Sequence, residues 1–141
     1  MNSPEIVRLD AGNVDLLITF ISKIGKAGDT FRYFEKRTVA VINNHLVTFL
    51  LLFEELPVAY GHLELEDKTV WLGICVLPDY SGKGFGNIMM NGLIDKAKEL
   101  NIQSIDLTVD KINLAGVKLY EKFNFKKLTE GGSYDRYQLI L

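Results

Sequence analysis

Residues 77–87, with the sequence LPDYSGKGFGN, constrain the fold more than any other part of the chain. An apolar strand ends at Pro78, glycines occupy positions 82, 84 and 86, and an amphipathic helix is predicted to follow. A strand, a glycine-rich turn and a helix in this order direct free backbone N–H groups and the positive end of the helix dipole toward one point. A phosphate or a pyrophosphate is the natural ligand there, because glycines let the backbone approach an anion closely.

Three kinds of phosphate-binding loop compete for this segment. A Walker loop requires Ser or Thr after the lysine, whereas Gly84 follows Lys83. A dinucleotide-binding loop requires a third glycine, and Met89 stands at that position. The acetyl-CoA loop has the pattern Gln/Arg-x-x-Gly-x-Gly/Ala, and residues 81–86 (SGKGFG) fit it at both glycines but miss the first position. The remaining alternative is that the glycines only form a tight turn.

The composition is that of an ordinary globular chain, with 141 residues, 48% hydrophobic and 24% charged. This length predicts a single domain over residues 1–141 that buries a core without disulfides. The net charge of −2 argues against a nucleic-acid partner, and no Cys/His spacing around the single Cys75 indicates a metal site. The start lacks the apolar segment of a signal peptide, and the longest apolar run, residues 46–53, is too short to span a bilayer. We therefore expect a cytoplasmic protein without a membrane partner.

Hydrophobic periodicity predicts short strands and helices separated by turn residues. The expected strands are residues 5–9, 46–53, 57–65, 69–76, 105–109, 125–128 and 134–141, and the expected helices are residues 13–24, 30–37, 87–100 and 113–123. Short acidic turns separate the second, third and fourth strands, which predicts an antiparallel meander. Strand–helix–strand crossovers follow it. The expected fold class is α/β, with a mixed, mostly antiparallel central sheet flanked by helices.

Three features together resemble the GNAT superfamily of acyl-CoA N-acyltransferases. The first is the strand of residues 71–78 (WLGICVLP), and the second is the glycine loop with the helix after it. The third is residues 110–125 (DKINLAGVKLYEKFNF), which are similar to the family's Asn-x-x-Ala…Leu-Tyr-Glu-Lys-x-Gly-Phe segment. The element order agrees over all 141 residues. The resemblance implies a GNAT-like fold, acetyl-CoA as cosubstrate, no metal, and N-acetyl transfer.

The resemblance also implies a role for individual residues. Backbone groups of Ile74 and Val76 would pair with the pantetheine arm, and splaying of their strand from residues 105–109 would make the slot for the thioester. Asn113 would contact the cosubstrate, and Tyr120 would stand near its sulfur. The CoA pyrophosphate would be held by the backbone amides of Gly82, Lys83, Gly84, Phe85, Gly86 and Asn87.

Two positions depart from the family pattern. Ser81 stands where Gln or Arg is usual, which puts one side-chain contact to the cosubstrate in doubt. Asn124 stands where Gly is usual after the helix. Because Asn tolerates the left-handed conformation better than most residues, we expect the helix to end as it does in the family.

Direct transfer requires a polarised thioester carbonyl and a stabilised thiolate, with both reactants held together. Tyr120 is the candidate acid for the departing sulfur, and it shares a helix face with Asn113, seven residues earlier. A backbone N–H of residues 74–76 is expected to polarise the carbonyl. Cys75 is disfavoured as a nucleophile, because it lacks a nearby His in sequence and buried strand cysteines are usually inert.

The base that accepts the amine proton has three candidates. Glu64 and His62 alternate onto the same strand face, and Asp110 follows the strand of residues 105–109. Each also has a purely structural explanation, as a solvated strand residue or a hydrogen-bonded histidine. No base is needed if a fraction of the amine arrives deprotonated.

The acceptor is the least constrained part of the prediction. Residues 30–37 (TFRYFEKR) mix aromatic and basic side chains, which suits either an anionic or aromatic acceptor or a helix with an apolar core face. The leading hypothesis is acetylation of a small-molecule amine in a ternary complex, by a monomer or a homodimer. The alternatives are a peptide or protein N-acetyltransferase and a non-catalytic acetyl-CoA-binding module.

Overall fold

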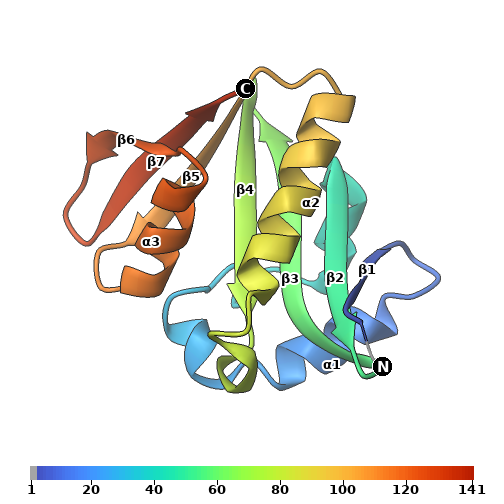
Figure 1. Ribbon diagram of the computed structural model, residues 1–141. Coiled ribbons are helices and arrows are strands. Elements are labelled where there is room, and N and C mark those ends of the chain that lie inside the picture. The colour runs from blue at the N-terminus through green and yellow to red at the C-terminus, as the bar shows by residue number, and fades with distance from the viewer. Residues whose placement is uncertain (1–2) are drawn as a thin grey trace.

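A computed structural model describes residues 3–141 as a seven-stranded sheet with helices on both faces (Figure 1). The strands are β1 (Glu5–Arg8), β2 (Val47–Phe53), β3 (Leu56–Glu66), β4 (Thr69–Val76), β5 (Ser104–Asp110), β6 (Lys126–Glu130) and β7 (Tyr134–Ile140). The helices are α1 (Asp15–Ser22), α2 (Phe85–Glu99) and α3 (Leu114–Lys122), with short 3-10 helices at Gly25–Asp29, Val39–Asn44 and Pro78–Tyr80. None of these helices has both the length and the hydrophobicity needed to cross a bilayer.

The sheet has the order β1-β2-β3-β4-β5-β7-β6. Every neighbouring pair is antiparallel except β4 and β5, which are parallel. β2, β3 and β4 form the predicted meander, joined by tight turns at residues 54–55 and 67–68 with positive φ angles. The expected mixed, mostly antiparallel sheet is confirmed.

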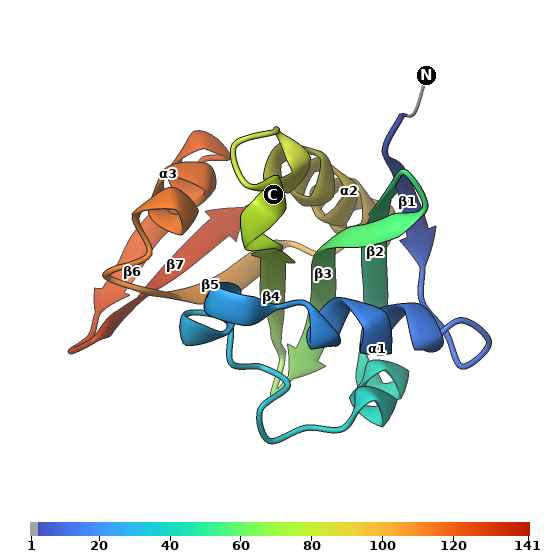
Figure 2. The same cartoon turned by 90° about the horizontal axis from the view of Figure 1, so that it is seen from below.

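Two apolar layers cover the sheet, with α2 and α3 on one face and α1 on the other (Figure 2). The central strand β3 is buried on both faces, so its side chains alternate between the two layers. Gly61 faces α2, and a Cβ there would lie 2.7 Å from the Met89 sulfur. Its neighbours Tyr60 and His62 are buried on the opposite, α1 side. The absence of a side chain at Gly61 therefore lets α2 lie close against the sheet.

The helix predicted for residues 30–37 is wrong, because these residues form turns. The Phe31 ring packs on Tyr60 with centroids 5.5 Å apart, and the Tyr33 ring packs on His62 at 4.5 Å. Both rings therefore reach the same face of β3. On an α-helix these two side chains would point to nearly opposite sides, since two residues rotate by about 200°. Tertiary packing of the aromatic rings outweighs the local helical pattern.

The other helices agree with the sequence in kind and differ at their ends. α1 is shorter than predicted at both ends, and the 3-10 helix at Val39–Asn44 was not anticipated. α2 begins at Phe85, two residues before the predicted start, because Gly84 already occupies the cap position. Asn113 caps α3 as predicted, its Oδ1 accepting a hydrogen bond from the Gly116 amide at 3.0 Å. Asn124 ends that helix with φ 72°, the left-handed conformation expected there.

Candidate active site

The sheet opens between β4 and β5, and this opening organises the site. The two strands are paired at only one position, Trp71 with Asp106, and they diverge beyond it (Figure 1). The buried Asp106 carboxylate holds the joined end, accepting hydrogen bonds from Arg136 Nε at 2.7 Å and Gln138 Nε2 at 2.9 Å. The Arg136 guanidinium also stacks over the Trp71 ring, 4.7 Å from its centroid. The splaying expected for residues 105–109 is therefore present.

A cavity of about 1130 Å³ lies at the opening. Its walls come from β3, β4, the glycine loop, α2, the end of β5, α3 and residues 27–37. Twelve of the thirteen residues proposed from the sequence line it, and only Lys83 does not. Those twelve are His62, Glu64, Ile74, Val76, Gly82, Gly84, Phe85, Gly86, Asn87, Asp110, Asn113 and Tyr120.

The glycine loop forms one end of this cavity. Gly82 and Gly84 have φ angles of 75° and 83°, a conformation that favours glycine, and Gly84 is the N-cap of α2. The first intrahelical bond runs from the Ile88 amide to the Gly84 carbonyl. Within residues 3–141, the amides of residues 82–87 donate no hydrogen bond to the protein. This set of free donors, next to the positive end of a 15-residue helix, suits a pyrophosphate.

Side chains around the loop are engaged locally. The Ser81 hydroxyl donates to the Pro78 carbonyl at 2.8 Å, so it is turned into its own loop. Lys122 Nζ, at the end of α3, donates to Asn87 Oδ1 at 3.0 Å and ties that helix to the start of α2. Lys83 is exposed outside the cavity wall. The anion-binding character of the loop therefore comes mainly from its backbone.

Tyr120 lies on the buried face of α3 and also lines the cavity. Its side chain is 6% exposed, and burial raises the pKa of its hydroxyl above the ordinary value. No protein group within residues 3–141 hydrogen-bonds this hydroxyl, although it borders the cavity. A phenol kept protonated in this way can donate a hydrogen bond to a thiolate, whereas full proton transfer becomes harder as its pKa rises.

Cys75 also lines the cavity, from the β4 side. Burial raises the pKa of its thiol to about 12. The thiol is therefore protonated at neutral pH and is a poor nucleophile. A mechanism with an acetylated Cys75 is disfavoured for this reason, as the sequence predicted.

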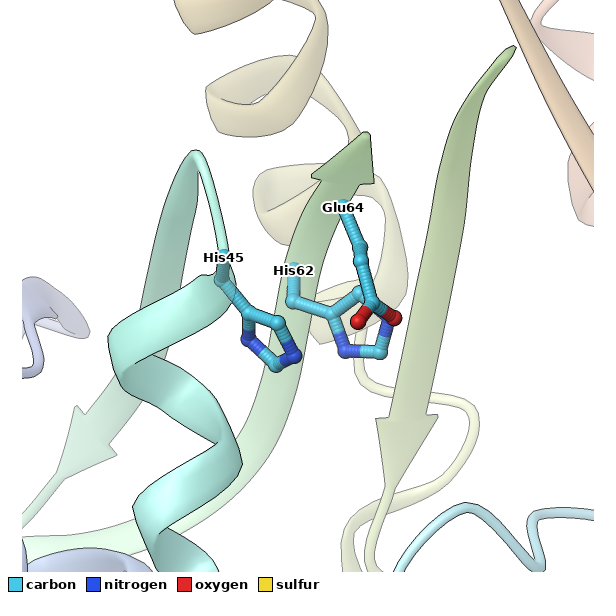
Figure 3. Close-up of side chains that lie close together, drawn as sticks. All are labelled: His45, His62 and Glu64. Atoms are coloured by element: carbon cyan, nitrogen blue, oxygen red, sulfur yellow. The ribbon is translucent and has the colours of Figure 1, made fainter. Parts of the chain in front are cut away.

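The candidate bases belong to a hydrogen-bonded cluster that the sequence did not reveal. The Tyr33 hydroxyl donates to Glu64 Oε1 at 2.8 Å and lies 2.7 Å from His45 Nε2. His62 Nδ1 lies 2.6 Å from the Tyr60 hydroxyl. Figure 3 shows three of these side chains converging, His45 from the turn before β2, and His62 and Glu64 from β3.

Burial determines the protonation of the two histidines in this cluster. Removal from water lowers the pKa of His45, and it lowers the pKa of the more deeply buried His62 well below the ordinary value. Both imidazoles are therefore neutral at pH 7. His62 is a weak base for this reason, whereas Glu64 reaches the cavity with one carboxylate oxygen not engaged by Tyr33. Neither Tyr33 nor His45 was singled out in the sequence, because their partners are 12 to 31 residues away.

The third candidate base, Asp110, is held by an ion pair. Its carboxylate oxygens lie 3.1 and 3.3 Å from the two terminal nitrogens of Arg32. The pair links residues 30–37 to the end of β5 across the cavity. Both carboxylate oxygens of Asp110 are therefore engaged by Arg32, whereas Glu64 has one oxygen not engaged by Tyr33.

The chain matches the model of the acetyltransferase (GNAT) family over residues 18–125. It therefore belongs to this family, and the resemblance found in the sequence is confirmed. Curated relatives carry the name [ribosomal protein bS18]-alanine N-acetyltransferase. The protein of Haemophilus influenzae is 37% identical over 62 residues, which are 44% of this chain and 42% of the relative. The protein of Escherichia coli K12 is 31% identical over 68 residues, 48% of this chain and 46% of the relative.

The matches thus span less than half the length of these curated relatives. Among solved structures, the PaiA N-acetyltransferase from Thermoplasma acidophilum, determined in complex with coenzyme A, superposes with a TM-score of 0.80. That match covers 99% of both chains at 16% identity. At this identity the likeness establishes the fold alone.

Proposed function

We propose that this protein transfers the acetyl group of acetyl-CoA to the amine of a peptide or protein. The main support for the proposal is the separation of β4 from β5. It leaves a slot that is lined by the glycine loop, with its free amides, and by Tyr120. Coenzyme A is bound by the PaiA structure that shares this fold. A thioester lying in the slot would have its diphosphate on the loop and its sulfur toward α3.

Each part of the reaction can then be assigned to a group of this chain. The loop amides bind the diphosphate, and backbone groups of Ile74 and Val76 hold the pantetheine arm, since the edge of β4 that faces β5 has no strand partner beyond Trp71. Glu64 takes the proton of the attacking amine, with His62 as the alternative. Tyr120 donates a hydrogen bond to the departing thiolate. Binding both reactants in one cavity lowers the barrier by about 7 kcal/mol or more.

A macromolecular acceptor replaces the small-molecule amine as the favoured hypothesis. The curated relatives act, by their names, on the alanine of a ribosomal protein. The acceptor side of the cavity is also walled by residues 30–37, which form turns and contribute Arg32, Tyr33 and Arg37. Exposed polar side chains of this kind are suited to hydrogen-bonding an extended peptide.

The test is acetyl transfer to a matched set of acceptors. One peptide has a free N-terminal alanine, the second has a blocked N-terminus and a free lysine, and the third sample is free alanine. Thiol release together with peptide mass identifies the acetylated amine. We expect the first peptide to react fastest. Preference for free alanine would return the acceptor to the small-molecule class, and absence of turnover with bound coenzyme A would indicate a non-catalytic module.

A further inference from the structure

The two histidines of this chain, far apart in sequence, meet at one wall of the cavity. His45 and His62 are the only histidines among the 141 residues, and their ring centroids lie 4.3 Å apart. Glu64 completes a group of three, with one potential ligand atom of each residue within 4.8 Å of the others (Figure 3). Pairing of β2 with β3 produces this meeting, because Thr48 lies opposite His62 in the register.

Hydroxyl groups fix the orientation of both rings. His45 Nδ1 lies 2.8 Å from Thr48 Oγ1, and His62 Nδ1 lies 2.6 Å from the Tyr60 hydroxyl. His62 Nδ1–H can donate to the Tyr60 hydroxyl, which leaves the lone pair of this ring on Nε2. The Tyr33 hydroxyl donates its single proton to Glu64 and therefore accepts from His45 Nε2–H. When an ion displaces Tyr33, His45 takes the other tautomer, with Nδ1–H donating to Thr48 Oγ1 and the lone pair on Nε2. Outer hydrogen bonds of this kind hold histidine ligands in metalloproteins.

We propose that His45, His62 and Glu64 bind a divalent transition-metal ion of the zinc class, with the fourth coordination position open to the cavity. Two imidazoles and one carboxylate suit zinc or cobalt, whereas magnesium and calcium prefer all-oxygen ligands. The site faces the cavity through His62 and Glu64, which gives an ion a path of entry.

Ion binding requires a small rearrangement around Tyr33. Ligand bonds of about 2.0–2.2 Å place the ligand atoms of a tetrahedral zinc site about 3.4 Å apart, so separations of up to 4.8 Å must shrink by up to about 1.4 Å. The Tyr33 hydroxyl now bridges His45 Nε2 and Glu64 Oε1. The ion takes the place of this hydroxyl, and Tyr33 loses both hydrogen bonds. The Arg37 guanidinium, 4.2 Å from the centre of the Tyr33 ring, opposes the added positive charge and moderates the affinity.

The primary experiment is a titration of tag-free, EDTA-treated protein with Zn²⁺ and with Co²⁺, without acetyl-CoA. Calorimetry is expected to give one ion per chain. Imidazole NMR signals of both histidines are expected to shift together, and the Co²⁺ form is expected to show the visible absorption of a four-coordinate ion. Absence of binding heat, or a shift of only one histidine, overturns the proposal.

Variants test the set of ligands. His45→Gln and Glu64→Gln are expected to weaken Zn²⁺ binding by about a hundredfold, because loss of an inner ligand exceeds the 10–100-fold effect of an outer partner. Glu66→Gln is the matched control, since Glu66 lies on the same strand but outside the group of three and is exposed. Unchanged affinity in His45→Gln, with the fold verified by circular dichroism, overturns the ligand set. His45 and Glu64 are only partly buried, so these variants are expected to fold.

Tyr33→Phe tests the displaced hydroxyl. Removing the hydroxyl eliminates a competitor for His45 and Glu64, so Zn²⁺ is expected to bind this variant more tightly than the wild-type chain. Weaker binding would make the phenol a ligand and would contradict the proposed set.

A bound ion also has a consequence that rests on the proposed function. It occupies Glu64 and His62, the candidate bases, so acetyl transfer is expected to fall on addition of Zn²⁺ and to recover with EDTA. The binding titration does not use activity. Loss of turnover in all samples with intact Zn²⁺ binding therefore contradicts the proposed function alone.

Discussion

The two sides of the cavity are built in different ways. The cosubstrate side consists of backbone groups within one short stretch, where a strand, a glycine loop and a helix follow each other directly. The side that we propose for the acceptor consists of side chains from the turn segment 30–37 and from β3, with His45 of the turn before β2 bonded to them. The first can be recognised from spacing along the chain, whereas the second exists only after the sheet has formed.

This difference also concerns chemistry. Backbone amides at a helix start cannot change their charge, so the cosubstrate side is a fixed anion site. The acceptor side contains titratable groups, whose protonation depends on burial and on their neighbours. Substitutions on the two sides, and changes of pH, should therefore have different measurable effects.

Tyr120→Phe is expected to have the largest effect and to separate catalysis from cosubstrate binding. Turnover should fall by about a hundredfold, the lower range for loss of a positioned acid. Coenzyme A affinity should stay nearly constant, because the loop amides are untouched. Tyr137→Phe, at a buried tyrosine of β7 that does not line the cavity, serves as the control. Full turnover by Tyr120→Phe would remove this residue from the mechanism.

Gly84→Val disturbs the cosubstrate side through its backbone. Gly84 has φ 83°, where a β-branched residue is strained by at least about 1–2 kcal/mol, so the loop should relax and the amides should no longer converge. We expect coenzyme A affinity to fall about tenfold, measured by calorimetry. Gly132→Val is the control, because Gly132 has open space and no positive φ. Equal affinity in the two variants would show that the loop does not bind the cosubstrate.

A fall in pH is expected to lower the free energy of unfolding through His62, on the acceptor side. The pKa of the buried His62 is lowered in the folded chain, so the unfolded chain binds a proton at about pH 6.5 before the folded chain does. Stability from this residue is therefore complete above pH 6.5 and decreases as the pH falls, by at most about 1.4 kcal/mol per pH unit. Urea unfolding between pH 7 and 5 measures the slope. His62→Gln should flatten it, and an equal slope in that variant contradicts the assignment.

Arg32→Gln should have the smallest effect on the fold. Because the Arg32 side chain is 50% exposed, solvent screens its pair with Asp110, which therefore contributes little to stability. Thermal unfolding should therefore change little, whereas the KM of a peptide acceptor should change more than that of acetyl-CoA. A larger change for acetyl-CoA would place the pair on the cosubstrate side.

The sequence by itself determined the mixed sheet, the meander, the glycine loop and the caps at Asn113 and Asn124. These features depend on residues within one or two turns of each other, where periodicity, glycine conformation and capping act directly. Twelve of the thirteen proposed site residues consequently line one cavity, while their individual roles stay predictions.

Only the tertiary structure decided the conformation of residues 30–37 and the partners of Glu64. Phe31 and Tyr33 leave the helical pattern because burying both rings on the same face of β3 is more favourable than a short isolated helix. His45 and His62 meet because strand pairing sets Thr48 opposite His62. Contacts across a sheet depend on register and on the packing of distant segments, which local sequence patterns do not encode.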